Sequence, residues 1–327
     1  MSKQSMGRVI AWIGITAIVV MVIAAEIVLR RWFGFGNPLL YVADERIGYI
    51  LAPNQEVRRF GNRILINHYS MRGEAIAQKR PPQTLRLLLL GDSIANGGWW
   101  TAQTDTISAL LQQQLTSSIH ATTTSNTVEV LNASANSWGP RNELAYLQTY
   151  GCFESQALIL LLNTDDLFAT TPTSVQVGRD RNYPAQRPPF AIAELIGRYM
   201  LPPVAIPELE AVRAEGGDRI GKNLEAIRQI HTYITQQGGT MIVVLTPLLR
   251  ELVGPGSREY EIKARDRLTT FTQNHRIAYL DMLPLLNAHD NPKELYRDHI
   301  HFNFQGNQFI TQQVIVHWLD SAIATLH

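Results

Sequence analysis

Near the C-terminal end of the chain, an acidic residue precedes a histidine by three positions. Asp298 and His301 lie in segment 298–307, just before the last helix that the sequence predicts. In a tight turn this spacing lets the carboxylate reach Nδ1 of the imidazole, while Nε2 faces outward to take a proton from a hydroxyl. We therefore expect His301 to be a general base that Asp298 orients. His299 would point to the other side of the turn, and a solvated acid and histidine in a surface turn is the alternative interpretation.

A serine that could act as the nucleophile follows an apolar run at 85–90, in which Arg86 is the one charged residue. The segment Gly91-Asp92-Ser93 comes directly after this run, and Gly97 lies on the far side of Ser93. Glycines on both sides let the backbone turn sharply and let a substrate approach the hydroxyl. A Gly-Asp-Ser turn can also simply cap a helix. Together with the acid and the histidine near the C-terminus, however, Ser93 completes the groups needed for nucleophilic acyl transfer.

Short apolar runs and helical patterns alternate along the chain. The apolar runs, each closed by a polar or proline-containing turn, lie at 85–90, 128–132, 158–162, 241–245 and 277–280. The helical patterns lie at 106–115, 142–149, 220–236, 260–274 and 307–326. Strands that alternate with helices predict right-handed crossovers and a parallel sheet covered on both faces, which is a three-layer α/β/α sandwich. Ligands of such sheets bind at the carboxyl ends of the strands, where Ser93 is expected.

The order and spacing of these motifs resemble those of SGNH/GDSL hydrolases. The resemblance rests on Gly91-Asp92-Ser93, on Asn132-Ala133-Ser134 after the second strand, on a polar turn after the third and on Asp298-x-x-His301, and it covers residues 86–326. It implies a flavodoxin-like α/β/α fold and a serine esterase in which Ser93 is the nucleophile, His301 the base and Asp298 the orienting acid. Bacterial members with an N-terminal span, which also resemble segment 53–73, are often linked to ester chemistry of the cell envelope or of exopolysaccharides.

The sequence departs from the family pattern at the oxyanion hole. The resemblance assigns the backbone N–H of Ser93 to the hole, Ser137 to the slot of a glycine and Asp165 to the slot of an asparagine, with Gly139 as the neighbour of Ser137. Serine keeps the backbone N–H donor, whereas an ionised carboxylate accepts hydrogen bonds and repels an oxyanion. Three solutions remain open: Asp165 is protonated, Asn163 supplies the amide donor, or two backbone donors suffice.

Three functional hypotheses follow from this site. Because serine, histidine and acid are all present, we expect an esterase that acts on an acylated polysaccharide or a lipid ester, without a cofactor. Acyl transfer to a sugar hydroxyl uses the same mechanism, and an envelope binding or assembly protein would use the cleft without chemistry. Trp99, Trp100 and Trp138 follow the first two motifs, where they either flank the cleft or pack in the core.

The strongest shift in composition lies at the N-terminus. Residues 9–25 are apolar apart from Gly14 and Thr16, a length that suits one membrane-spanning helix. A cleaved signal peptide is the alternative, but the apolar run is long for one. Both hypotheses export the following domain, and we expect a single-pass membrane protein with its catalytic domain outside the cytoplasm.

Composition narrows the class of protein further. The chain has 327 residues, of which 29 are basic and 28 acidic, and the scattered charges offer no stripe for nucleic acid. No glycine-rich phosphate loop, dinucleotide fingerprint or metal-ligand motif is present. The single cysteine, Cys152, precludes an internal disulfide and is expected to be a core thiol.

The same patterns divide the chain into three parts. We expect a tail and membrane anchor at 1–31, a juxtamembrane strap with short strands at 32–84 and the catalytic domain at 85–327. Within the last part, the proline-rich stretch 170–207 is expected to be an insertion, which is a lid, a partner surface or a passive excursion.

Overall fold

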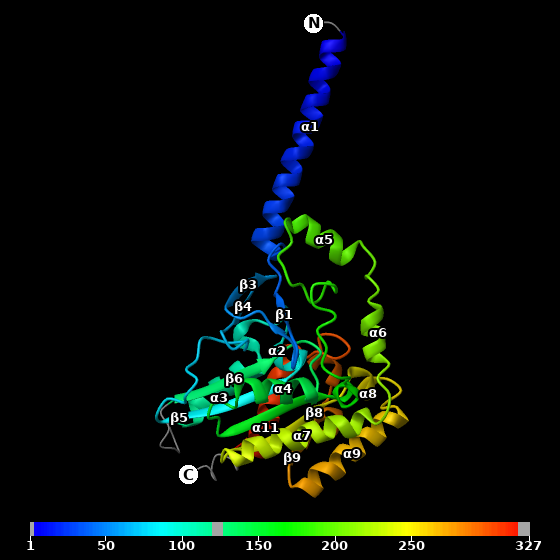
Figure 1. Cartoon of the computed structure of the whole chain (residues 1–327). Coiled ribbons are helices and arrows are strands. Elements are labelled where there is room, and N and C mark those ends of the chain that lie inside the picture. Colours follow the sequence, from blue (N-terminus) through cyan, green and yellow to red (C-terminus); the bar gives the residue numbers. More distant parts are fainter. Residues whose placement is uncertain (1–2, 120–126, 320–327) are drawn as a thin grey trace.

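A parallel sheet forms the centre of the protein in the computed structural model, which describes residues 3–119 and 127–319 (Figure 1). Within these residues the sheet has five strands in the order β6-β5-β7-β8-β9. They are β5 (Thr84–Gly91), β6 (Thr127–Ser134), β7 (Ala157–Asn163), β8 (Thr240–Thr246) and β9 (Ala278–Asp281). Each neighbouring pair is parallel, as the alternation of strands and helices predicts. The chain order reverses around β5, and ligands of such sheets bind beside this reversal.

The position of strand β5 explains why residues 87–90 are apolar without interruption. Leu88 and Leu90 belong to the core on one face of the sheet. Leu87 and Leu89 belong to the core on the other face. Since successive side chains of a strand point to opposite faces, a strand that is covered on both sides needs an apolar residue at every position.

Helices cover both faces of the sheet and complete the predicted three-layer sandwich. One face carries α4 (Pro140–Tyr150), α7 (Arg219–Gln236) and α9 (Glu259–His275). The other carries α3 (Ile107–Ile119), α10 (Met282–Asn287) and α11 (Phe304–Val314). On α7, the buried residues Ile227, Ile230 and Ile234 recur at helical spacing, so this apolar stripe explains how the helix packs.

Two small antiparallel hairpins precede the sandwich. Strands β1 (Tyr41–Asp44) and β2 (Gly48–Leu51) form one, and β3 (Gln55–Arg59) and β4 (Asn62–Ile66) form the other. Their apolar side chains join the core beside α4 and α7. The remaining elements are the helices α2 (Ser93–Asn96), α5 (Ala191–Tyr199), α6 (Pro207–Arg213) and α8 (Leu249–Val253), the 3₁₀ helices η2 (Gln103–Asp105), η3 (Thr164–Phe168) and η4 (Pro292–Leu295), and the π-helical turns η1 (Leu29–Phe33) and η5 (Ile315–Leu319).

The N-terminal helix α1 (Lys3–Val28) projects away from the sandwich (Figure 1). Together with η1 it is long and apolar enough to cross a membrane, and none of its most apolar window is buried against the protein. An apolar helix that contacts no protein core differs from the amphipathic helices of the sandwich.

Two segments differ in detail from the helices that the sequence predicts. The last helix, expected over 307–326, is α11 followed by η5, and residues 320–326 lie outside the described part of the chain. The stretch 170–207 shows no clear sequence period, yet it contains α5. This helix is short and lies between Pro188-Pro189 and Pro202-Pro203, whose rings interrupt a helical pattern on both sides.

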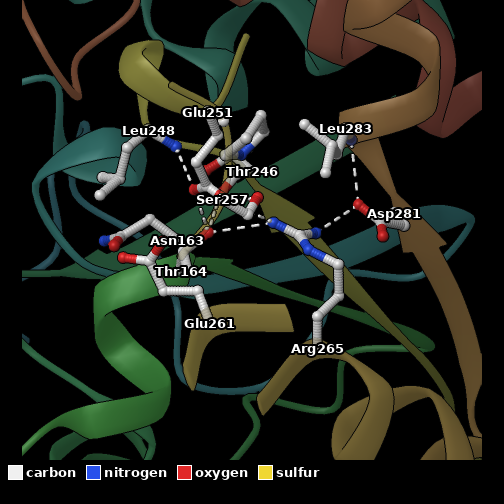
Figure 2. A network of polar contacts seen from close by, with 12 residues as sticks. Asn163, Thr164, Thr246, Leu248, Glu251, Ser257, Glu261, Arg265, Asp281 and Leu283 are labelled. Atoms are coloured by element: carbon white, nitrogen blue, oxygen red, sulfur yellow. Dashed lines mark hydrogen bonds and ion pairs between the residues drawn. The ribbon is translucent and has the colours of Figure 1, made fainter. Parts of the chain in front are cut away.

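A buried polar network ties together the turns that follow β7, β8 and β9 (Figure 2). Arg265 on α9 donates to Asp281 Oδ1 at 2.5 Å, to Thr164 Oγ1 at 3.1 Å and to Glu251 Oε2 at 3.3 Å. Glu251 also accepts from the hydroxyls of Thr164 at 2.7 Å and Ser257 at 2.6 Å. The hydrogen bonds of one arginine therefore connect the carboxyl ends of three neighbouring strands.

Removing this arginine should cost far more stability than removing a surface arginine of the same helix. Arg265→Met leaves the buried carboxylate of Glu251 without its cation, which typically costs about 3–5 kcal/mol. Arg267→Met is the matched control, because Arg267 pairs with Asp218 in solvent and such pairs contribute up to about 1 kcal/mol. Thermal unfolding of both variants compares the two losses, and equal shifts in Tm would show that the network does not stabilise the fold.

Candidate active site

Three residues from the beginning and the end of the sandwich's sequence meet at the carboxyl edge of the sheet. Ser93 Oγ lies 2.9 Å from His301 Nε2. His301 Nδ1 lies 2.9 Å from Asp298 Oδ2 and 3.0 Å from Oδ1. Ser93 is the first residue of α2, directly after β5, and the other two lie in the loop before α11. The arrangement can transfer a proton from the serine hydroxyl to the imidazole.

The loop that carries the histidine is organised by Asp298. Its Oδ1 accepts backbone N–H groups from Ile300 at 3.0 Å and His301 at 2.9 Å. Partial burial raises the pKa of Asp298, but the hydrogen bonds from the backbone and ring of His301 outweigh it and hold this pKa below its usual range. Asp298 is therefore ionised at neutral pH, keeps the proton of His301 on Nδ1 and leaves Nε2 as the acceptor.

His299 lies on the outside of the same turn. Its side chain is 85% exposed, and its Nδ1 is 3.8 Å from Asp298 Oδ1. The hydroxyl of Ser93 is bonded to His301 instead.

The turn between β5 and α2 exposes the serine because two neighbours fix its backbone. Gly91 lies so close to β7 that a Cβ would come within 2.7 Å of Leu161 O. Asp92 then caps α2, since its Oδ1 accepts the N–H of Ile94 at 2.7 Å. The glycine and the aspartate of the Gly-Asp-Ser segment thus position the third residue.

Buried carboxyl groups lie beneath the serine. The side-chain amide of Asn163 donates to Asp92 Oδ2 at 2.8 Å and to Asp166 Oδ2 at 2.9 Å. Burial raises the pKa of Asp92 and drives the pKa of Asp166 well above its usual range. Burial does the same to Glu143, whose carboxyl oxygens have no hydrogen-bond partner within the described residues. Because both amide protons of Asn163 are used here, this residue links the loops after β5 and β7 instead of aiming a donor into the cleft.

Ser137 lines the same cleft as Ser93 and His301. Its φ of 58° lies in the left-handed region, where glycine is the least strained residue, which agrees with its match to a glycine slot. Its hydroxyl is 2.9 Å from the hydroxyl of Tyr183, which comes from the 170–207 stretch. The neighbouring Gly139 is used differently, because its N–H donates to Asn142 Oδ1 at 3.1 Å and caps α4.

Asp165 borders a second hollow of the cleft, of about 440 Å³, together with Ser93, His299 and His301. Its side chain is only partly exposed, and its backbone N–H donates to Asn163 Oδ1 at 2.7 Å. Partial burial raises the pKa of Asp165, and the carboxylate of Glu261 raises it further. Asp165 therefore takes up a proton at a higher pH than an ordinary aspartate does.

Two of the three tryptophans singled out in the sequence flank the cleft. The ring of Trp100 lies 4.4 Å from the ring of His301, and Arg297 lies over Trp99 at 5.0 Å and over Trp100 at 4.9 Å. Trp138 is instead a core residue, whose Nε1 donates to a backbone carbonyl at 3.0 Å. Sequence reasoning missed Arg297 and Tyr183, although Arg297 directly precedes Asp298 and could have been noticed there.

The first hollow of the cleft is a cavity of about 250 Å³ that reaches from Ser93 and His301 to the strap. Its wall includes the rings of Trp99 and Trp100 and the side chains of Arg59 and Arg198. Among the described residues, no group of three or more His, Cys, Asp or Glu side chains is arranged to hold a metal ion.

A parallel α/β/α sandwich with a serine and a histidine in contact at its carboxyl edge is the architecture of an SGNH-type hydrolase. The chain belongs to the GDSL-like lipase/acylhydrolase family, which matches residues 89–309, and it is an esterase or acylhydrolase. The search of curated proteins gives no match.

The solved structures to which the chain is similar are distant in sequence. They include the acetyl xylan esterase AlAXEase, at 12% identity and a TM-score of 0.45, with 71% of this chain and 98% of that chain covered. The acetylxylan esterase Axe2 from Geobacillus stearothermophilus has 12% identity and a TM-score of 0.46, with coverage of 71% and 93%. A lipase/acylhydrolase from Enterococcus faecalis has 14% identity and a TM-score of 0.43, with the same coverage.

Removing either side of the serine–histidine contact should abolish hydrolysis. Ser93→Ala and His301→Ala are each expected to lower kcat for an aryl ester by about 10⁴–10⁶-fold, because nucleophile and base act as a unit. His299→Ala is the matched control and should retain most activity, since His299 makes no contact with Ser93. An inactive His299→Ala variant together with an active His301→Ala variant would show that His299, and not His301, is the base.

Proposed function

We propose that the protein is a membrane-anchored serine esterase that cleaves O-acyl esters of envelope polysaccharides or lipid esters by a covalent acyl-enzyme mechanism. The observation that carries this proposal is the continuous chain of hydrogen bonds from Ser93 Oγ through His301 to Asp298. In the proposal, residues 1–31 anchor the protein, 32–84 form the strap and 85–327 carry catalysis, with 170–207 beside the cleft.

The geometry supports the following steps. Ser93 Oγ attacks the ester carbonyl while His301 Nε2 takes the hydroxyl proton, and the tetrahedral intermediate then expels the alcohol, which receives that proton from His301. A water molecule, deprotonated by the same nitrogen, then attacks the acyl-serine. The second tetrahedral intermediate breaks its bond to Ser93 Oγ, which receives the proton back from His301, and the carboxylic acid leaves. Asp298 stabilises the imidazolium that forms in both halves of the reaction.

The oxyanion requires donors that this chain supplies mainly from its backbone. We assign the backbone N–H groups of Ser93 and Ser137, since both residues border the cleft at the reacting hydroxyl. The first residue of a helix has no partner for its N–H within the helix, so Ser93 is suited to this role. Asn163 holds the loops in place, and Asp165 occupies the position of the third donor, where only its protonated form can donate.

A fluorophosphonate probe separates an enzyme from a binding protein that keeps the fold alone. Only a serine activated by a base attacks phosphorus, so we expect covalent labelling of the wild type. Ser93→Ala should remain unlabelled, and intact-mass measurement should show a single adduct. A folded wild type that stays unlabelled would favour the binding hypothesis. An acyltransferase would also be labelled, but it would transfer the acyl group to an added sugar faster than to water.

Asp165 is expected to lower the activity of the enzyme. Asp165→Asn replaces a carboxylate beside the oxyanion by an amide donor, and we expect kcat/KM to rise by about 10- to 100-fold. At acidic pH the kcat/KM of the wild type approaches that of the variant, because the carboxyl group of Asp165 becomes protonated there. The gain is limited, since His301 must stay neutral to act as the base. The ratio of variant to wild-type kcat/KM should therefore increase as pH rises through the raised pKa of Asp165.

A pH–rate profile of both proteins measures this ratio. Loss of activity in a correctly folded Asp165→Asn variant would contradict the assignment, because it would give the carboxylate a positive role, such as orienting the substrate.

Membrane anchoring is supported by α1 itself. Its apolar window is fully exposed, and its length matches the roughly 20 residues that a helix needs to cross the hydrocarbon core. Cleavage as a signal peptide would remove this helix, whereas an anchor keeps the esterase at the membrane surface.

A further inference from the structure

Helix α5 has an inverted polarity. Its inner face places Glu194 and Arg198 against the protein beside the small Ala191, while Ala193 and Ile196 on the outer face, and Met200 directly after the helix, are exposed. A surface helix normally buries its apolar stripe and exposes its charges. No other part of the chain that the structure describes covers the outward apolar face of α5.

Strong polar contacts hold α5 in this orientation. Glu194 accepts from Arg59 Nη2 at 2.6 Å, from Arg198 Nε at 2.9 Å and from the backbone N–H of Gly36 at 2.7 Å. Burial raises the pKa of Glu194, but the hydrogen bonds from Arg59 outweigh it and keep the pKa below the usual range. Turning the helix over would remove Glu194 from Arg59 and leave this buried arginine without its carboxylate, so the apolar face stays outward.

The apolar surface extends beyond the helix on both sides. Phe190, at its start, is 62% exposed, and Met200, at its end, is 73% exposed. The surface, which we name the α5 outer face, consists of Phe190, Ile196, Tyr199, Met200, Leu201 and Val204. Clustered exposed residues of this size mark a binding surface more often than scattered ones do.

The N-terminus of α5 is attached to α1 where the apolar run 9–25 ends. The carboxylate of Glu26 accepts the backbone N–H groups of Ala191 at 2.8 Å and Ile192 at 3.1 Å. Arg30 donates to the carbonyl of Pro189 at 3.0 Å and pairs with Glu26. Figure 1 accordingly shows α5 beside the lower end of α1, on the side of the sandwich from which α1 projects. A membrane crossed by α1 would have its surface at the level of α5.

We propose that the α5 outer face binds the surface of the lipid bilayer that α1 spans, so that α5 lies in the interface as an amphipathic helix. The inference rests on the proposed anchoring by α1. The exposed Trp32 at the end of the span and Tyr199 on α5 are residue types that favour the membrane interface. Arg30 and Arg31 lie at the same level, where anionic headgroups attract them.

This contact would fix the active site relative to the membrane. Arg198, on the inner face of α5, also lines the cavity that contains Ser93. Arg59 lines the same cavity and binds Glu194 of α5. A bilayer-bound α5 therefore holds the cavity wall that Arg59 and Arg198 form at a constant height above the lipid.

Spin labels on the full chain in vesicles of phosphatidylcholine and phosphatidylglycerol test the proposal. Cys152 is the single cysteine, so Cys152→Ser provides a background for one label at a time. A label at Met200→Cys reports on the α5 outer face, and a label at Ile18→Cys reports on the anchor α1. A label at Ile262→Cys, an exposed position of α9, is the aqueous control. Power saturation compares the accessibility of each label to oxygen, which enters lipid, and to nickel–EDDA, which stays in water.

We expect oxygen to relax the Met200→Cys label several-fold more than nickel–EDDA does, as at Ile18→Cys, and the reverse at Ile262→Cys. A label at 200 that behaves like the aqueous control, while position 18 is in lipid, would overturn this inference and leave the anchor intact. An aqueous label at 18 would overturn the anchor and the inference with it. Spin–spin broadening at 200 that depends on protein density would assign the surface to a second copy and also overturn the proposal. Hydrolysis of a soluble aryl ester at the wild-type rate verifies that the labelled chains are folded.

Discussion

The buried amide of Asn163 is the contact on which the geometry of the site depends. It joins Asp92, at the end of β5, to Asp166, in the turn after β7. Asp92 in turn caps α2 and thereby fixes the backbone of Ser93. Two carboxyl groups this deep in the protein need hydrogen-bond donors, and one amide supplies both of them. The position of the nucleophile thus follows from how the protein satisfies buried polar groups beneath it.

This use of Asn163 has an electrostatic consequence. An amide that is committed to the scaffold is not available to an oxyanion, and the neighbouring Asp165 brings an acidic group to the same edge of the cleft. In the proposed mechanism, stabilisation of the developing charge then depends on the preorganised backbone at Ser93 and Ser137. The left-handed φ of Ser137 is part of that preorganisation, since the turn is held although its residue is not glycine.

The same principle, in which polar contacts fix an orientation, operates at the end of the molecule from which α1 projects. Glu194 holds α5 against Arg59, and Glu26 caps its first turn. Both contacts are charge-assisted and short, so they fix the direction in which the α5 outer face points. Arg59 and Arg198 also border the cleft, which places the proposed membrane contact and the proposed chemistry in one connected structure.

Features that depend on neighbours in the chain can be predicted from the sequence. The apolar run of β5, its end at Gly91-Asp92-Ser93 and the three-residue spacing of Asp298 and His301 each encode their local geometry, because strands alternate their side chains and a tight turn spans three residues. The alternation of strands and helices fixed the α/β/α class for the same reason.

Contacts between distant segments were decided by the tertiary structure alone. Asn163 and Asp165 are both plausible donors in the sequence, and only the packing of β7 beside β5 commits the amide of Asn163 to Asp92. Tyr183 reaches Ser137 from a stretch without sequence period. The outward apolar face of α5 is equally invisible, because periodicity shows that a helix has two faces but not which one a buried partner such as Arg59 will attract.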